Sequence, residues 1–137
     1  MATFHFRNAS VTINTVDLSD HVRSVTLTHT ADTLDETAMG DTFRNRIAGL
    51  QDWSLDVEFL SDFANAEIDH TLNALVGAAP FAVILKADAG ATSATNPKWT
   101  GNVLLESYPI IDGTVGDLAV VRVRFVGAGT LTRGTSD

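Results

Sequence analysis

The sequence predicts a mainly β protein: an antiparallel β-sandwich in one domain, residues 1–137, with a single helix at its flank. Several segments alternate apolar and polar residues with the period of two that marks half-buried strands. Only one segment has the longer period of a helix. Hydrophobic residues make up 45% of the chain, which at this length is enough for one core.

Two strands are expected before residue 31. Ser10 to Ile13 alternates polar and apolar residues, and Asp17 to Asp20 has the composition of a turn. Arg23 to Thr30 alternates again, with hydroxyl side chains on one face and apolar residues on the other. His29 falls on the apolar face, where a core or interface histidine is a better interpretation than a metal ligand.

The clearest strand runs from Gln51 to Leu60. One of its faces is strongly apolar and consists of Trp53, Leu55, Val57 and Phe59. The opposite face is polar and consists of Asp52, Ser54, Asp56 and Glu58. Asp56 and Glu58 are same-face neighbours, as paired glycosidase carboxylates can be, but such pairs normally come from different strands in an aromatic cleft. A solvated sheet face is therefore the better interpretation.

The segment from Ala31 to Gly49 shows neither a strand period nor a helix period. We expect a long polar loop here. A loop of this length within a compact domain is unusual and is generally either functional or disordered. The segment is therefore the first candidate for a binding role.

A helix is expected over residues 63–76, where apolar residues recur at helical spacing. Gly77 supplies the residue that ends a helix, and Pro80 prevents its continuation. Phe81 to Ala87 follows as a nearly continuous apolar strand, which predicts burial on both faces.

Two further strands complete the sheet, Trp99 to Tyr108 and Asp117 to Val126, with the turn signal Asp112-Gly113 between them. Natural sheets protect their edge strands with proline or inward charge. Arg23 to Thr30 and Asp117 to Val126 carry neither. We therefore expect both to lie at edges that pair with neighbouring subunits and close a ring.

Composition excludes several functions. A net charge of −8 and an isoelectric point near 4.7 disfavour binding to nucleic acid phosphates and to anionic membranes. The chain has no cysteine for disulfides or thiolate metal sites, and no signal peptide or membrane span is expected. The four histidines show no metal-ligand spacing: His5, His21, His29 and His70. We expect no catalysis, no metal and no cofactor.

The segment from Val16 to Phe63 resembles the N-terminal half of the major tail protein, or tail tube protein, of long-tailed phages and gene-transfer particles. Three motifs carry the resemblance: D-x-L-D-E-T-A-M-G-D at residues 32–41, R-x-R-I-A-G-L at residues 44–50, and the V-x-F-x-G-x-G-like end at residues 123–129. The order of strands and helix also matches, so the resemblance extends over nearly the whole chain.

The resemblance implies a structural virion protein rather than an enzyme. In this family six subunits form a ring whose inner sheets join into one barrel, and stacked rings form the tube through which the genome leaves. The implied partners are further copies of the chain, the tail terminator, the tape measure protein and the distal tail protein. DNA would pass without specific binding and no membrane would be involved. The implied location is the virion tail, assembled in the host cytoplasm.

The resemblance also assigns site residues. Lumen-facing positions would be Asp52, Ser54, Asp56, Glu58, Asn102 and Glu106. Arg122 and Arg124 depart from a wholly acidic lumen, and we expect them to pair with carboxylates across strands. The long loop would reach the adjacent ring and be mobile in the free subunit. Its contact residues would be Asp32, Leu34, Asp35, Glu36, Met39, Phe43, Arg44, Arg46 and Ile47.

The alternative function is a carbohydrate-binding or receptor-binding β-sandwich on a virion or cell surface. Such modules usually expose several aromatic side chains on one face. Here Trp53 and Phe59 share the apolar face of their strand, which indicates a core instead.

Overall fold

The computed structural model describes residues 9–63 and 68–136. This part of the chain is mainly β, as predicted, with one short α-helix, Ile68–Asn73 (α1), and a 3-10 turn at Ser19–His21 (η1). The strands are Ser10–Ile13 (β1), Val16–Asp17 (β2), Val22–Asp35 (β3), Arg46–Leu60 (β4), Phe81–Lys86 (β5), Lys98–Ser107 (β6), Val120–Gly127 (β7) and Thr132–Gly134 (β8).

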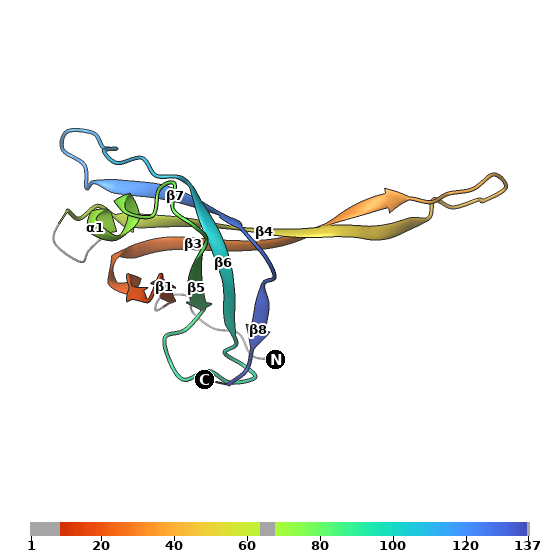
Figure 1. The fold of residues 1–137 in the computed structure, drawn as a ribbon, viewed down its shortest axis with the longest axis horizontal. Coiled ribbons are helices and arrows are strands. Elements are labelled where there is room, and N and C mark those ends of the chain that lie inside the picture. Colours follow the sequence, from red (N-terminus) through yellow and green to blue (C-terminus); the bar gives the residue numbers. More distant parts are fainter. Residues whose placement is uncertain (1–8, 64–67, 137) are drawn as a thin grey trace.

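All eight strands belong to one antiparallel sheet, in the order β2-β1-β5-β6-β7-β4-β3, with β8 paired to β6. The sheet folds over on itself, so that β5, β6 and β8 cross the direction of β3, β4 and β7 (Figure 1). The two layers expected of a sandwich are therefore halves of a single hydrogen-bonded sheet.

The core lies between these halves. Alternate residues of β4 and β7 are buried, including Leu55, Phe59 and Phe125. They meet residues of the other half, and the rings of Phe81 and Phe125 pack edge to face with centroids 6.0 Å apart. Strand β5 is buried on one face only, through Phe81, Val83 and Leu85, so the expectation of burial on both faces was wrong. Its other face is the outside of the folded sheet.

The side chain of Trp53 packs β4 against β6 and β7. Its indole Nε1–H donates to the carbonyl oxygen of Gly129 at 2.8 Å, and the side chain is 3% exposed. Gly101 in β6 and Gly127 in β7 lie directly against the ring. A Cβ atom on Gly127 would come within 2.4 Å of the indole nitrogen, and one on Gly101 within 2.5 Å of a ring carbon. Both positions must therefore lack a side chain.

Helix α1 covers one flank of the core through the buried residues Ile68, Thr71 and Leu72. It is shorter than the predicted 63–76, and residues 64–67 of that range lie outside the described residues. The helix ends at Asn73, so the expectation that Gly77 ends it was wrong. Gly77, with a φ of +76°, lies instead in a turn after the helix, in which the amide of Ala78 donates to the carbonyl of Leu75 at 3.1 Å.

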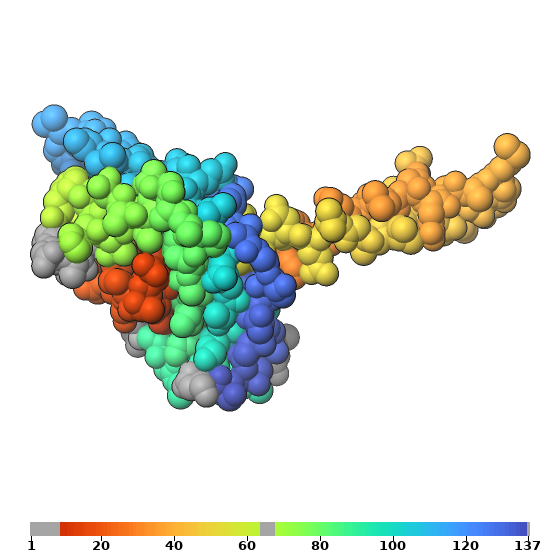
Figure 2. All heavy atoms as spheres, viewed as in Figure 1, coloured from red at the N-terminus to blue at the C-terminus, as the bar shows by residue number. Residues whose placement is uncertain are grey.

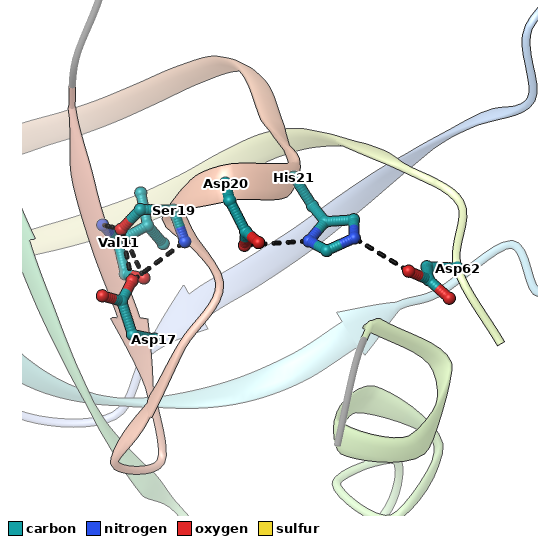
Figure 3. Close-up of polar contacts among 6 residues, drawn as sticks. All are labelled: Val11, Asp17, Ser19, Asp20, His21 and Asp62. Carbon is teal, nitrogen blue, oxygen red and sulfur yellow. Dashed lines mark hydrogen bonds and ion pairs between the residues drawn. The ribbon is translucent and has the colours of Figure 1, made fainter. Parts of the chain in front are cut away.

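Polar contacts around η1 hold together the two chain segments at the base of the β3–β4 hairpin, where β3 begins and β4 ends. The hydroxyl of Ser19 accepts the amide of Val11 at 2.8 Å, and Asp17 accepts the amide of Ser19 at 3.0 Å (Figure 3). The imidazole of His21 lies between two carboxylates, 2.9 Å from Asp20 and 2.9 Å from Asp62. These contacts join the start of β3 to the segment that follows β4.

The expected loop at Ala31 to Gly49 is largely a β-hairpin, so that prediction was wrong. Strands β3 and β4 stay paired as far as Asp35 and Arg46, which leaves only residues 36–45 as the connection. This hairpin projects far beyond the body of the protein (Figures 1 and 2). We call residues 31–50 the arm. Almost every residue in it is exposed, and hence no core imposes the alternation by which strands are recognised in a sequence.

One of the two expected sheet edges is confirmed. Strand β3 ends the strand order and pairs only with β4 among the described residues, so its outer edge is unpaired. The expectation for Asp117 to Val126 was wrong, because β7 lies between β4 and β6. Among the described residues, the segment of β7 that lacks a strand partner on the side of β6 is Val120 to Val123.

The contact between Gly127 and Trp53 predicts a large effect from a small substitution. We expect Gly127→Ala to lower the free energy of unfolding by about 1–3 kcal/mol, because the added methyl group overpacks the indole. Urea denaturation measures the change. Gly90→Ala is the matched control: that glycine lies in an exposed loop, its nearest heavy atom to an added Cβ is 3.8 Å away, and a change within roughly 0.5 kcal/mol is expected. Equal effects would contradict the role given to Trp53.

Tyr108 provides a test by titration, because it is the only tyrosine in the chain. Its hydroxyl donates to Asp69 Oδ1 at 2.8 Å, and burial, then this bond and the charge of Asp69, raise the pKa of the phenol well above its usual range. The resulting stabilisation is complete below the unfolded pKa of about 10 and is lost as pH rises towards the folded value.

Ultraviolet absorbance of the phenolate should therefore titrate at higher pH in the native protein than in urea. In Asp69→Asn we expect a smaller rise in the pKa of Tyr108, since burial remains the largest cause. Superimposable native and unfolded titration curves would refute this environment for Tyr108.

Candidate functional site

The predicted lumen residues of β4 lie on the sheet face opposite the core, as their alternation requires. Trp53, Leu55, Val57 and Phe59 are buried, and the intervening polar residues point outward. Asn102 and Glu106 of β6 are also exposed and alternate with buried Val103 and Leu105. We call this surface of β3, β4, β7 and β6 the polar face.

Arginine side chains neutralise part of the polar face. Arg124 of β7 lies opposite Asp56 of β4 in the strand register. Its guanidinium is 3.1 Å from the Asp56 carboxylate and 3.0 Å from that of Glu106, so it joins three neighbouring strands. The hydrogen bond to Glu106, followed by the charge of Asp56, raises the pKa of Arg124 further above its already high value. The expected cross-strand pairing is confirmed for this residue.

The second arginine is held more loosely. Arg122 lies opposite Glu58, with its Nε 3.8 Å from the carboxylate, and its side chain is 81% exposed. Asp52 has no cationic partner within ion-pair distance in the described part of the chain; its carboxylate accepts the amide of Trp53 at 2.8 Å. Among the predicted lumen residues together with Arg122 and Arg124, four carboxylates against two guanidinium groups leave a charge of −2, so this strip of the polar face is mildly acidic.

Hydroxyl groups border the charged strip. Ser24, Thr26, Thr28 and Thr30 of β3 lie opposite Glu58, Asp56, Ser54 and Asp52 in the register and share their face. All four hydroxyl residues are exposed. The polar face therefore offers short, uncharged side chains beside a line of ion pairs, and it carries no cluster of unpaired cations that would retain a polyanion.

The tip of the arm is an ordered turn. The amide of Glu36 donates to the carbonyl of Asn45 at 2.9 Å and closes the hairpin. The hydroxyl of Thr37 accepts the amide of Asn45 at 2.8 Å, and Asp41 accepts the amide of Ala38 at 2.8 Å. The side chain of Thr37, and then its amide, which donates to Asp35 at 2.9 Å, lower the pKa of the Asp35 carboxyl group. Arg44 lies 3.9 Å from Asp35, and both side chains are exposed, so this ion pair is weak.

Large apolar side chains are exposed along the arm. Leu34 and Ile47 form a cross-strand pair on one face of it. Met39 and Phe43 stand at the tip, where Phe43 is 83% exposed. Sequence reasoning named these four residues and missed Leu50, which is 82% exposed. Apolar side chains displayed on a hairpin without a core beneath them indicate a surface for another protein.

A second exposed apolar group was missed altogether. It lies in the connection between β6 and β7, residues 108–119, which we call the distal loop because it joins the end of β7 remote from the arm. Its exposed members are Ile110, Ile111, Val115 and Leu118. The sequence signal was present as four apolar residues in a turn region rich in Gly and Asp.

No three His, Cys, Asp or Glu side chains in residues 9–63 and 68–136 come together as metal ligands would. No helix in the same ranges is long and apolar enough to cross a membrane. His29, which was expected to be a core or interface histidine, is exposed, so it is not part of the core; its Nε2 lies 2.9 Å from the side-chain oxygen of Gln51.

Comparison of the sequence with protein-family models gives no match, and comparison with curated proteins gives none either. Solved structures do match. A chain from the virion of a native gene transfer agent particle is 14% identical, with 96% of this chain and 98% of that chain covered and a TM-score of 0.77. A chain from the tail of an empty gene transfer agent particle is 16% identical, with 82% and 81% covered and a TM-score of 0.67.

A third match comes from the PVC extracellular contractile injection system, in its sheath/tube terminator in the extended state. It is 13% identical, with 97% of both chains covered and a TM-score of 0.69. At such identities the similarity concerns the fold, and it extends over nearly the whole length of the chains. The protein therefore has a tail-tube-like fold, in agreement with the family that its sequence resembles.

Proposed function

We propose that this chain is a structural virion protein whose copies form hexameric rings that stack into a tail tube, the conduit for DNA ejection. The observation that carries the proposal is the arm: a hairpin with exposed apolar side chains, projecting from a body that has a tail-tube-like fold. A free monomer gains nothing from exposing these side chains. A subunit that must reach a neighbouring copy requires such a surface.

Ring closure is supported by the unpaired edge of β3. This strand is 14 residues long, contains no proline, and leaves its outer hydrogen-bonding groups without a strand partner among the described residues. Such an edge readily pairs with another chain, and a closed ring of sheets removes it. In the proposed ring the neighbouring subunit pairs with this edge through Val120 to Val123 of β7. This segment pairs with β4 on one side and has no strand partner on the side of β6 among the described residues.

In the proposed tube the polar face lines the lumen. The charge of −2 on its acidic strip in each subunit would weakly repel duplex DNA, and the repulsion would be screened over about 8 Å at physiological salt. Its ion-paired arginines would not release counterions from the phosphates as free cations do. A duplex would then slide without specific binding. Other partners would be the tail terminator, tape measure and distal tail proteins, with assembly in the host cytoplasm.

The alternative of a carbohydrate-binding or receptor-binding module has less support. Trp53 and Phe59 are buried in the core. Among the described residues, the exposed phenylalanines are Phe43, at the arm tip, and Phe63, in the segment before α1, and these two form no common aromatic platform.

The direct test is electron microscopy of the purified protein together with an arm-deletion variant. We expect the intact chain to form rings or tubes. The deletion variant lacks residues Thr33 to Ala48, whose first and last members pair with each other, and joins Asp32 to Gly49 through a two-residue Asn-Gly turn. It should keep a folded body, because the removed residues are exposed. This variant should not stack into tubes. Long tubes from the deletion variant would refute the role of the arm, and an intact chain that stays monomeric at high concentration would refute the proposal as a whole.

Lumen charge is tested most cleanly at Asp52, because replacing it breaks no ion pair in the polar face. We expect Asp52→Lys to assemble normally but to slow DNA ejection, more at low salt than at high salt, since added cations in the lumen bind phosphates in a salt-dependent way. Release of DNA from assembled particles is measured over a range of salt concentrations.

Asp88→Lys is the matched control for that experiment. It makes the same change of charge in the exposed loop after β5, and its carboxylate, like that of Asp52, accepts one nearby backbone amide. Its ejection rate should equal that of the unaltered chain. Unchanged ejection in Asp52→Lys at low salt would remove the polar face from the lumen.

A further inference from the structure

We infer that an apolar groove on the body of one copy binds the distal loop of a copy in the adjacent ring of the stack. This inference rests on the proposed tube function and adds a contact between rings in which the arm takes no part. It begins from two apolar surfaces that the described part of the chain leaves uncovered. One is the distal loop, and the other lies between the two halves of the folded sheet.

The groove opens where the outermost strand, β3, faces the other half of the sheet. Its volume is about 310 Å³, at the lower end of the range for ligand pockets. Leu27 of β3 is only half-buried, although its partner Leu55 in β4 is fully buried, because the inward side of β3 faces the groove here. Side chains of the kind that build the core therefore remain open to a partner. The apolar residues that line the groove are Val25, Leu27, Leu85, Ala87, Trp99 and Leu131.

Three cations surround the groove. Lys86 lines it, and Lys98 directly precedes Trp99. The guanidinium of Arg133 lies over the ring of Trp99, 5.9 Å from its centroid, in a cation–π contact. Among the described residues, none of these three side chains has a carboxylate within ion-pair distance. Their charges are therefore not neutralised by the part of the chain that the structure describes.

A count of every charged residue gives the two surfaces opposite signs. The distal loop contains Asp112 and Asp117 and no cation, which gives −2, and neither aspartate has an ion-pair partner among the described residues. The three cations and one carboxylate, that of Asp88, leave +2 on the segments that form the groove, which are residues 25–29, 85–99 and 131–134. The groove is thus a basic and apolar site on a chain of net charge −8, and the distal loop is an acidic and apolar segment.

The distal loop is held at both of its ends. The hydroxyl of Tyr108 donates to Asp69 at 2.8 Å, and the carbonyl of Ala119 accepts the amide of Ser61 at 3.0 Å. These bonds keep the loop beside α1 and the segment that follows β4. Figure 1 shows it at the end of the molecule opposite the arm.

The groove lies at a different level along β4. It reaches His29, which pairs with Trp53, whereas the distal loop leads into Val120, which pairs with Leu60. The stretch of β4 between these two pairs spans roughly 20 Å at the usual rise of a strand. No residue of the distal loop is among those that line the groove. The two surfaces therefore meet only between two copies that are displaced along the hairpin.

The symmetry of such a contact fits a stack. It joins two different surfaces of the same molecule, and it does not close on itself when the copies are related by translation, so it repeats without limit. In the proposed tube, six of these contacts would join each pair of neighbouring rings. Apolar side chains would be buried at the centre of each contact, and the charges would lie around them.

Charge distinguishes the distal loop from the other occupants that the chain offers. Two distal loops would bring their aspartates together, and two grooves would bring their cations together, which disfavours both symmetric contacts. Residues 1–8 contain two phenylalanines, but they carry Arg7 and no carboxylate. The arm has a charge of −2, yet Phe43 at its tip is directly followed by Arg44, a cation that would enter the basic groove with it. The distal loop brings apolar side chains without a cation.

Cysteine cross-linking tests the inference, because the chain contains no native cysteine. Ala87→Cys in the groove and Val115→Cys in the distal loop are made in separate chains of different mass, mixed, assembled and oxidised. We expect a disulfide-linked heterodimer in the assembled material. Homodimers of either variant should be scarce, since neither surface meets its own copy.

Two controls place the first cysteine or the second one elsewhere. Ala82→Cys lies on the outer face of β5, away from the groove, and with Val115→Cys it should give roughly a tenth as much heterodimer or less, because these thiols meet only by random encounter. Phe43→Cys tests the arm as the occupant, and it should give equally little heterodimer with Ala87→Cys.

A charge exchange provides the second measurement. Lys98→Glu with Arg133→Glu turns the groove from +2 to −2, and Asp112→Lys with Asp117→Lys turns the distal loop from −2 to +2. Either pair alone, added to the corresponding cysteine chain, should lower the yield of the Ala87–Val115 heterodimer severalfold, and more at low salt than at high salt. The two altered chains together should recover it, since the charges across the contact are again opposite.

The outcomes separate this inference from the proposed function. Tubes that form without the Ala87–Val115 heterodimer leave the tube function intact and overturn the docking site. A heterodimer that forms although microscopy shows no tubes supports the contact and counts against the tube. A heterodimer with Phe43→Cys that is more abundant than the one with Val115→Cys makes the arm the occupant and overturns the inference. So does failure of the charge exchange to recover the heterodimer in chains that circular dichroism shows to be folded.

Discussion

The packing of Trp53 between two glycines is the contact on which the geometry of the molecule depends. The indole occupies space that side chains on Gly101 and Gly127 would fill, and its N–H group is satisfied by the carbonyl of Gly129. Three segments are thereby fixed to one side chain. Trp53 is also the first buried residue of β4, so the body ends and the arm begins at this point. The G-x-G end of the chain's third motif has a physical explanation: one glycine makes room for the ring, and the other, with a φ of +142°, offers its carbonyl.

A bulge beside this anchor changes the sides to which arm residues point. Ala31 pairs with Gln51 and Thr33 pairs with Ala48, so Gly49 and Leu50 both lie opposite Asp32. One extra residue reverses which positions of a strand point to a given face. On the polar side, β4 presents even-numbered residues in the body, but odd-numbered Ile47 in the arm. A Cβ atom on Gly49 would lie 3.1 Å from that of Asp32, which explains a glycine at this place. Leu50 follows the even-numbered residues of β4, which lie on the face opposite the core, and it is 82% exposed.

These two features mark what could and could not be predicted from the sequence. The strand at Gln51 to Leu60, the polar face and the cross-strand pairing of Arg124 follow from strict alternation over a core, which leaves its trace in the sequence. The arm has no core on either side, and its bulge breaks the alternation, so a hairpin there looked like a loop. The distal loop was missed for a related reason: apolar residues were interpreted as strand or core signals, and isolated ones within a turn carried no periodicity. The position of β7 inside the sheet depends on long-range pairing that no local pattern records.

The exposed apolar groups raise the question of why free copies would not aggregate, and net charge supplies an answer. Each copy carries −8, so two copies repel one another once they approach within about a Debye length, 8 Å at physiological salt. A single contact through the exposed apolar side chains must overcome this repulsion and the loss of freedom on association. In the proposed hexameric ring six arms would be held in fixed positions, so a further ring would gain six contacts at once. A single contact would then be weak and the sixfold set strong, which would favour growth from an existing ring over spontaneous association of free subunits.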